Sequence, residues 1–354
     1  MPRNNDPLVP KKPRTDPSSP FHNTVRGTGH KTDEQLKTQL ADKIPVSRVR
    51  DPNQFTVVTG GAGFLGTHLI KELNQRGQRN ILIVDDLSDP QKINNIKELK
   101  FMDYTDKSDF IKVLDAAAQH NLIDRVYHLG AESSTTYNNG KYLMENNYQY
   151  TCNVMEICSS ARVPLVYASS AAVYGEQTKE WGTFTATSDD YIPQSYYGLS
   201  KLQADKYARK FAENQQNYII GLRYFNVVSD GTHEQHKSQK SPLCWMTEQF
   251  NRSGVVQLFE GSADYYRDFI HVDEAIKTTI NAMTQGKTGV YNLGMGKAKS
   301  FYDLALEIVD NEDQIKYIPM PEDIAKGYQT YTCADMSNAC FAIPDGSSDK
   351  NVQI

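Results

Sequence analysis

The sequence predicts a doubly wound α/β fold, in which helices cover both faces of a parallel sheet. Three observations predict it. Short apolar runs alternate with helical patterns from Phe55 onward, a glycine-rich loop follows the first run, and a Tyr-x-x-x-Lys pair lies in a later helical stretch. Strands that alternate with helices imply a parallel sheet covered on both sides. After about Val227 the alternation breaks, and we expect a smaller C-terminal substrate-binding lobe there.

The composition excludes several classes of protein. The chain has 354 residues, with 38 Lys and Arg against 43 Asp and Glu, for a net charge of −5. This balance argues against nucleic-acid binding or a membrane-surface role, and no apolar run approaches the roughly 18 residues that a membrane helix needs. The five scattered cysteines include no CxxC pair. We therefore expect reduced thiols, no metal site and a cytoplasmic location.

The elements follow one another in a regular order after an irregular beginning. Eight of the 15 prolines lie in the first 52 residues, so we expect residues 1–50 to form a disordered extension. A helix is predicted from Leu65, Leu69 and Leu73, which recur at every fourth residue, and another over Ser200–Gln215. Six apolar runs are candidate strands: Phe55–Val58, Ile81–Val84, Val126–Leu129, Leu165–Ala168, Ile219–Leu222 and Val290–Leu293.

The loop after the first strand predicts dinucleotide binding. Gly60, Gly63 and Gly66 give a GxxGxxG spacing between a strand and a helix. Glycines there let the backbone turn tightly and approach a pyrophosphate, while the helix N-terminus points free N–H groups at the anion.

The loop and the order of the elements together predict the domains. We expect a Rossmann domain over 51–227 with a returning segment at about 268–298, and a substrate-binding lobe from 228–267 and 299–354.

The end of the second strand leaves the cofactor open between NAD and NADP. Asp85 and Asp86 stand where an acid accepts the adenosine ribose hydroxyls, which alone favours NAD. Lys92 and Lys107 follow the second and third strands and could neutralise a 2′-phosphate. From spacing alone they are equally well explained as two solvated lysines.

Tyr197 and Lys201 predict a catalytic pair. They lie four residues apart, on one face of a predicted helix. A free tyrosine, with a pKa of about 10, is a poor base, but a cationic neighbour and a positive nicotinamide ring favour its phenolate. Ser169 and Ser170 end a strand at the sheet edge where such folds bind ligands, so a hydroxyl there can hold the oxygen of the carbon being oxidised.

Together these features resemble the extended short-chain dehydrogenase/reductase family, and within it the nucleotide-sugar branch. Ser170, Tyr197 and Lys201 match that family's triad. The branch's dehydratases usually carry acid and base groups at the two positions after the triad hydroxyl. Here these positions hold Ala171 and Ala172, which favours an epimerase.

Less generic segments resemble the ADP-glyceromanno-heptose 6-epimerases over about residues 55–336. The segments are Gly140–Tyr142, Glu145–Tyr150, Tyr167–Ala172, Arg223–Val227, Leu258–Ser262 and Arg267–Phe269. The resemblance implies interconversion of ADP-D-glycero- and ADP-L-glycero-D-manno-heptose at C6″ by transient oxidation, a step in making a lipopolysaccharide core precursor. It also implies NADP in preference to NAD, and a homo-oligomer.

The resemblance further implies roles for individual residues. Those implied at the dinucleotide, besides the loop glycines, are Phe64, Leu65, Asp85, Asp86, Lys92, Lys107, Asn146, Lys201 and Val227. Those implied at the substrate are Ser133, Asn226, Phe259, Glu260, Gly261, Ser262, Arg267 and Tyr328. An arginine suits a diphosphate because its planar fork donates hydrogen bonds in pairs. A surface ion pair is the alternative for Arg267.

The sequence departs from the family's pattern at the second catalytic lysine. The family has a Gly-His-Lys-Gly-Ser-type loop, whereas this chain reads Gln235–Pro242, so Lys237 is the natural match and Lys240 competes. An inverting enzyme needs a base on each side of the carbon, and Lys237 opposite Tyr197 is the candidate. Two alternatives remain: an epimerase of a UDP- or GDP-hexose, and a non-catalytic nucleotide-sugar-binding protein.

Overall fold

The computed structural model describes residues 53–135, 137–176, 185–212, 218–229, 241–325, 328–339 and 341. The extension predicted over residues 1–50, and both Lys237 and Lys240, lie outside these ranges. The described residues all belong to one compact unit, and the boundaries predicted between a Rossmann domain and a smaller lobe stay a prediction.

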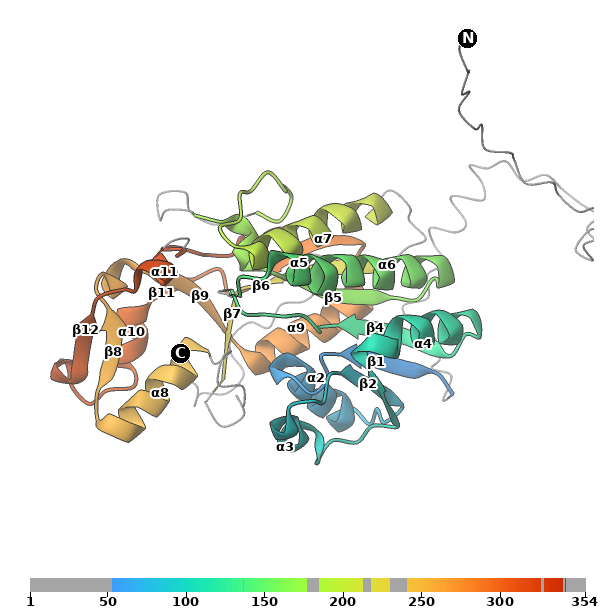
Figure 1. The fold of residues 1–354 in the computed structure, drawn as a ribbon, viewed down its shortest axis with the longest axis horizontal. Coiled ribbons are helices and arrows are strands. Elements are labelled where there is room, and N and C mark those ends of the chain that lie inside the picture. Colours follow the sequence, from blue (N-terminus) through green and yellow to red (C-terminus); the bar gives the residue numbers. More distant parts are fainter. Residues whose placement is uncertain are drawn as a thin grey trace, which may run out of the picture. The chain divides into compact units, whose positions relative to one another are not determined.

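Seven parallel strands form the central sheet, as the alternating pattern predicts (Figure 1). Their order is β10-β6-β5-β4-β1-β2-β3. The strands are β1 (Phe55–Thr59), β2 (Ile81–Asp85), β3 (Asp103–Asp106), β4 (Ile123–His128), β5 (Leu165–Ser170), β6 (Ile219–Tyr224) and β10 (Gly289–Leu293). The inner strands are almost wholly buried, which explains why they are nearly continuous apolar runs in the sequence.

Helices cover both faces of this sheet (Figure 1). On one face α2 (Phe64–Gln75) packs against α9 (Val272–Gln285), and their side chains share a core with β1 and β6. On the other face lie α4 (Lys107–Gln119), α6 (Tyr150–Ala161) and α7 (Tyr196–Ala212). Short helices α3 (Ile93–Ile96) and α5 (Gly140–Leu143) lie in the connections, and a π-helical segment, Met144–Gln149, leads into α6.

The remaining elements form two small sheets with their own core. The three-stranded sheet has the order β11-β9-β7, and the two-stranded sheet pairs β12 with β8. The elements are β7 (Asn226–Val228), α8 (Pro242–Ser253), β8 (Val256–Phe259), β9 (Tyr266–His271), β11 (Ala298–Ser300), α10 (Phe301–Leu306), β12 (Ile315–Ile318) and α11 (Glu322–Ala325). Apolar side chains from β7, β8, β9, α8 and α10 pack together between them.

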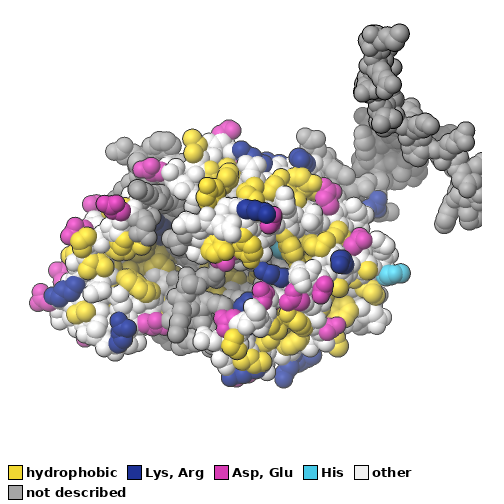
Figure 2. Space-filling model, in the orientation of Figure 1, with side chains coloured by type: hydrophobic (Ala, Val, Ile, Leu, Met, Phe, Trp, Pro, Cys, Tyr) yellow, Lys and Arg dark blue, Asp and Glu magenta, His cyan; other side chains and the backbone are white. Residues whose placement is uncertain are grey.

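Within the described residues, no helix is both long and apolar enough to span a bilayer. Four of the five cysteines are described, and all four are buried free thiols. On the face shown in Figure 2, basic and acidic side chains are interspersed over both parts of the molecule.

Candidate active site

The glycine loop between β1 and α2 has no room for a side chain at Gly60 or Gly66. Gly60 adopts a φ of +67°, and a Cβ there would lie 2.7 Å from the backbone nitrogen of Gly130. A Cβ on Gly66 would lie 2.1 Å from the carbonyl oxygen of Gly60. Gly63 is the N-cap of α2 and contributes no capping side chain, while Phe64 and Leu65 form the first turn, partly buried. The loop and helix end thus fit a dinucleotide pyrophosphate.

Two lysines lie beside the two acids at the end of β2. The Nζ of Lys92 lies 2.6 Å from Oδ1 of Asp85, whose other oxygen accepts a hydrogen bond from the Ala62 backbone N–H. The Nζ of Lys107 lies 3.8 Å from Oδ2 of Asp86. Both acids at this strand end therefore have a cationic partner.

Lys107 also connects this region to the π-helical segment. Its ammonium donates to the Tyr142 hydroxyl at 3.2 Å and to Oδ1 of Asn146 at 3.4 Å. Seven of the residues implied at the dinucleotide thus lie around the glycine loop and the ends of β2 and β3: Phe64, Leu65, Asp85, Asp86, Lys92, Lys107 and Asn146. Val227 stands apart from them, in β7 of the small sheet.

The three triad residues come from neighbouring elements. Ser170 ends β5, and its Oγ accepts a hydrogen bond from the Ala172 N–H at 3.1 Å. Tyr197 and Lys201 lie in α7 and are both buried. The Lys201 ammonium donates to the Ala168 carbonyl oxygen at 2.8 Å and lies 5.8 Å from the Tyr197 ring centre.

Burial dominates the protonation of this pair. Burial raises the pKa of Tyr197, a hydrogen bond with Ser170 lowers it, and Glu132 raises it again. Burial lowers the pKa of Lys201 to about 8, against the attraction of Asp205. Of the groups that shift the pKa of Tyr197, Ser170 is the one that favours the phenolate. The role expected for Lys201 beside the phenol stays a prediction.

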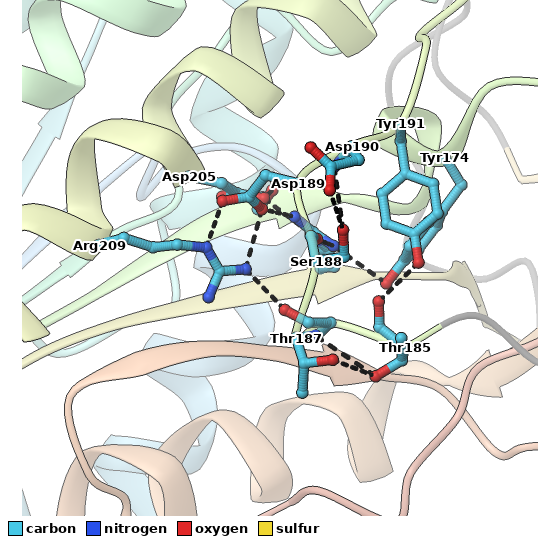
Figure 3. Close-up of polar contacts among 12 residues, drawn as sticks. Tyr174, Thr185, Thr187, Ser188, Asp189, Asp190, Tyr191, Asp205 and Arg209 are labelled. Carbon is cyan, nitrogen blue, oxygen red and sulfur yellow. Dashed lines mark hydrogen bonds and ion pairs between the residues drawn. The ribbon is translucent and has the colours of Figure 1, made fainter.

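A buried polar network supports the strand and helix that carry the triad (Figure 3). Asp205 lies in α7 one turn after Lys201 and is fully buried. Its carboxylate accepts hydrogen bonds from the Tyr167 hydroxyl at 2.9 Å, the Ser169 hydroxyl at 2.9 Å and the Arg223 Nε at 2.8 Å. Ser169 thus holds a structural partner, and Ser170 is the strand-end hydroxyl left to face the cavity.

The same network fixes the segment that precedes α7. Asp189 accepts hydrogen bonds from the Arg223 guanidinium at 2.6 Å and from Arg209. Arg209 also donates to the Ala186 carbonyl oxygen at 2.7 Å. Figure 3 shows the segment from Thr185 to Tyr191 lying against Arg209 and Asp205. Residues 193–196, which line the cavity described next, follow directly from this anchored segment.

A cavity of about 890 Å³ lies where β5, β6 and α7 meet the small sheets. Ser170 lines it, as do five residues implied at the substrate. These five are Asn226, Phe259, Ser262, Arg267 and Tyr328. The other three, Ser133, Glu260 and Gly261, are exposed and do not line it. The structure therefore brings one triad hydroxyl and most of the implied substrate residues together around one cavity.

Among the described residues that line the cavity, Arg267 is the basic one. It is 7% exposed, and within the described residues its guanidinium donates to the carbonyl oxygens of Tyr266 and Gln329 and pairs with no carboxylate. It lies between the rings of Phe301 and Tyr328, at 5.3 and 5.2 Å from their centres. Burial lowers its pKa. A buried guanidinium without an acidic partner suits an anionic ligand group.

Sequence reasoning missed several cavity residues. They come from the loop after β4, the segment before α7 together with the first residue of that helix, helix α8 and the segment after α11. These residues are Thr135, Tyr137, Asn138, Gln194, Ser195, Tyr196, Trp245, Gln329 and Thr332. Tyr137, Tyr196 and Trp245 are 39%, 55% and 40% exposed, which is unusual for aromatic side chains and places them at the rim. No local pattern marks these residues, because only the tertiary fold brings them together.

Among the described residues, no cluster of three His, Cys, Asp or Glu side chains could hold a metal ion. His128 is buried beneath the loop, where its ring nitrogens contact the hydroxyls of Thr59 and Thr151 at 2.7 and 2.9 Å. Burial lowers the pKa of His128 to about 3, so it is neutral and structural.

Comparisons with known proteins agree with this fold. Residues 56–294 match the family model described as the NAD dependent epimerase/dehydratase family. The chain is 39% identical over 290 residues to the ADP-L-glycero-D-manno-heptose-6-epimerase of Alkalilimnicola ehrlichii, which covers 79% of this chain and 89% of that protein.

Solved structures show the same architecture. The crystal structure of Helicobacter pylori ADP-L-glycero-D-manno-heptose-6-epimerase is similar with a TM-score of 0.69 and 27% identity, over 80% of this chain and 88% of that one. A UDP-glucose 4-epimerase from Thermotoga maritima is similar in fold, with a TM-score of 0.65 and 24% identity over 80% and 90% of the two chains. The chain therefore belongs to the NAD dependent epimerase/dehydratase family, as one of its epimerases.

Proposed function

We propose that the protein inverts C6″ of ADP-linked glycero-manno-heptose, using NADP. One observation carries the proposal. A single cavity has the Ser170 hydroxyl in one wall and, in another, the buried guanidinium of Arg267, which pairs with no carboxylate among the described residues. A nucleotide-linked sugar needs both features, a hydroxyl at the reacting carbon and a cation at its diphosphate.

The glycine loop, Asp85, Asp86, Lys92, Lys107 and Asn146 would hold the dinucleotide. When bound, the nicotinamide would accept a hydride from the sugar carbon and return it. Lys92 and Lys107 support NADP because they would meet a 2′-phosphate beside the acids, where NAD offers only hydroxyls.

The chain's own residues would manage the proton and the substrate. Ser170 would hydrogen-bond the oxygen at the reacting carbon, and Tyr197 would take the hydroxyl proton as the carbon–hydrogen bond breaks. Lys201, anchored on the Ala168 carbonyl, would hold its ammonium beside the tyrosine ring. The sugar with its transient carbonyl group would then rotate in the cavity, so that the hydride returns to the opposite face of the carbon.

A second base would serve the opposite face, and Lys237 is our candidate with Lys240 as its competitor. Changing each in turn to methionine separates them, because loss of a general base typically costs about 10²- to 10⁴-fold in rate. If neither change slows epimerisation, a lysine base on the second face is wrong.

Two further observations support epimerisation of this sugar. Ala171 and Ala172 carry no acid or base group that could eliminate water from the substrate. The A. ehrlichii relative, whose name states the ADP-heptose reaction, covers 79% of the chain at 39% identity.

Incubation with a panel of ADP-, UDP- and GDP-linked sugars tests the proposal, with NMR used to detect epimers. We expect the ADP-heptose epimers to interconvert and the hexose derivatives to react at least about tenfold more slowly, a difference of 1.4 kcal/mol. Preferential turnover of a UDP- or GDP-hexose would assign the rival substrate. Binding without turnover of any sugar would indicate a non-catalytic protein.

A further inference from the structure

Gln329 joins two walls of the cavity. Its side-chain amide donates to the Gly175 carbonyl oxygen at 2.7 Å and to the Ala171 carbonyl oxygen at 3.4 Å. Its backbone carbonyl oxygen accepts a hydrogen bond from the Arg267 guanidinium. One residue therefore contacts both the arginine and the turn Ala171–Gly175 that follows Ser170.

That turn is tightly fitted to the catalytic helix. The Ser170 Oγ accepts from the Ala172 N–H, and the Ala172 carbonyl oxygen would lie 2.5 Å from a Cβ on Gly198, the residue after Tyr197. At its other end Gly175, with a φ of +69°, packs on the Ile192 carbonyl, where a Cβ would approach to 1.9 Å. A shift of the turn would therefore move Ser170 relative to Tyr197.

The segment that carries Gln329 is itself fixed beside Arg267. The Tyr266 N–H donates to the Thr330 carbonyl oxygen at 2.8 Å, and the Thr332 N–H donates to the Tyr266 carbonyl oxygen at 3.1 Å. Tyr266 is the residue before Arg267. The segment and the arginine thus form one unit, and the Gln329 side chain extends from it to the turn.

We propose that Gln329 is a positioning residue, which couples occupation of the Arg267 anion site to the placement of the Ser170 turn. The inference rests on the proposed function, in that Arg267 is taken to bind the diphosphate of the substrate. An anion on Arg267 would hold the guanidinium and its bond to the Gln329 carbonyl in one place. The amide would then hold the turn with Ser170 in line with the reacting carbon.

Hydrogen exchange of the turn, read by mass spectrometry with and without ADP, tests this coupling. In the wild-type protein, saturating ADP should slow exchange of the peptide spanning Ala171–Gly175 by about fivefold or more, the low end of typical coupling between sites. Gln329→Leu removes the side-chain donors but keeps the backbone oxygen that Arg267 contacts. It should still bind ADP, yet lose the slowing. Gln329→Glu, which keeps the shape and also lacks the donors, should behave alike.

Gln314→Leu is the matched control. Gln314 is also a glutamine whose side chain holds backbone groups of a turn, those of Asp310 and Asn311, and it does not line the cavity. In this variant ADP should slow exchange as in the wild-type protein. A merely structural loss in Gln329→Leu would speed exchange equally with and without ADP, leaving their ratio unchanged.

The outcomes separate this inference from the proposed function. ADP binding that leaves the turn's exchange unchanged in the wild-type protein, or slows it equally in Gln329→Leu, overturns the coupling alone. Absence of ADP binding to the wild-type protein overturns the anion site and the coupling together. Calorimetric titration with ADP distinguishes the two.

Discussion

The Ser170 hydroxyl lowers the pKa of the Tyr197 phenol. Tyr197 is buried, and burial raises the pKa of its phenol; the hydrogen bond with Ser170 opposes this rise. Burial also lowers the pKa of Lys201, to about 8. The sequence places Lys201 four residues from the tyrosine, but it cannot show that both side chains are buried.

Replacing Ser170 by alanine should therefore shift the pH dependence of activity. Without the hydrogen bond, the pKa of Tyr197 rises further, and the active phenolate forms only at higher pH. We expect the rising limb of the kcat/KM profile to move to higher pH. Ser169→Ala is the control, because the Ser169 hydroxyl contacts Asp205 and should leave the limb in place. An unshifted limb in Ser170→Ala would refute this role.

Lys92 and Lys107 give a direct test of the choice between NADP and NAD. If they bind a 2′-phosphate, changing both to alanine should weaken NADP much more than NAD, because only NADP carries the extra charge. Titration of each cofactor by calorimetry measures both affinities. If both affinities weaken equally, the lysines pair with Asp85 and Asp86 but do not bind a 2′-phosphate. The two acids would then favour NAD as the cofactor.

Among the secondary-structure elements, the hydrogen bonds and ion pairs around Asp205 connect helix α7 to strands β5 and β6. Asp205 and Arg223 are both wholly buried, and Arg223 also pairs with Asp189. Removing one partner of a buried ion pair leaves an uncompensated charge. The strand that carries Ser170 and the helix that carries Tyr197 therefore depend on this network for their relative position.

Asp205→Asn should accordingly destabilise the fold by about 3 kcal/mol, the lower end of the range for breaking a buried pair, because Arg223 keeps Asp189. Glu72→Gln is the control: its pair with Arg76 lies on the outside of α2, and such pairs contribute about 0.3–0.5 kcal/mol. Denaturant unfolding measures both. Similar losses in the two variants would show that the network does not hold these elements together.

Prediction of elements from the sequence succeeded where packing leaves an apolar signal. All six predicted strands belong to the central sheet. The seventh, β3, is expected before Lys107, but the sequence gives no range for it, because this edge strand of sequence Asp-Tyr-Thr-Asp has no buried residue. Strand β4 begins at Ile123, three residues before the predicted start, because Asp124 and Arg125 interrupt its apolar run.

In the molecule as a whole, the candidate site is formed by segments that lie far apart in the sequence. Residues spaced close together, such as the glycines or Tyr197 and Lys201, could be predicted because one loop or one helix turn holds them. Gln329 contacts residues more than 150 positions away, and nothing in its local sequence indicates this. The resemblance named Arg267, but only the fold reveals that it is buried without a carboxylate in the described residues.

Epimerisation in D₂O distinguishes inversion by transient oxidation from inversion by proton abstraction. If hydrogen leaves the carbon as hydride and returns to it within the closed site, the product epimer should carry no deuterium at C6″, as read by NMR. Incorporation of one solvent deuterium at C6″ per turnover would mean that the carbon is inverted by proton abstraction and that no hydride returns to it.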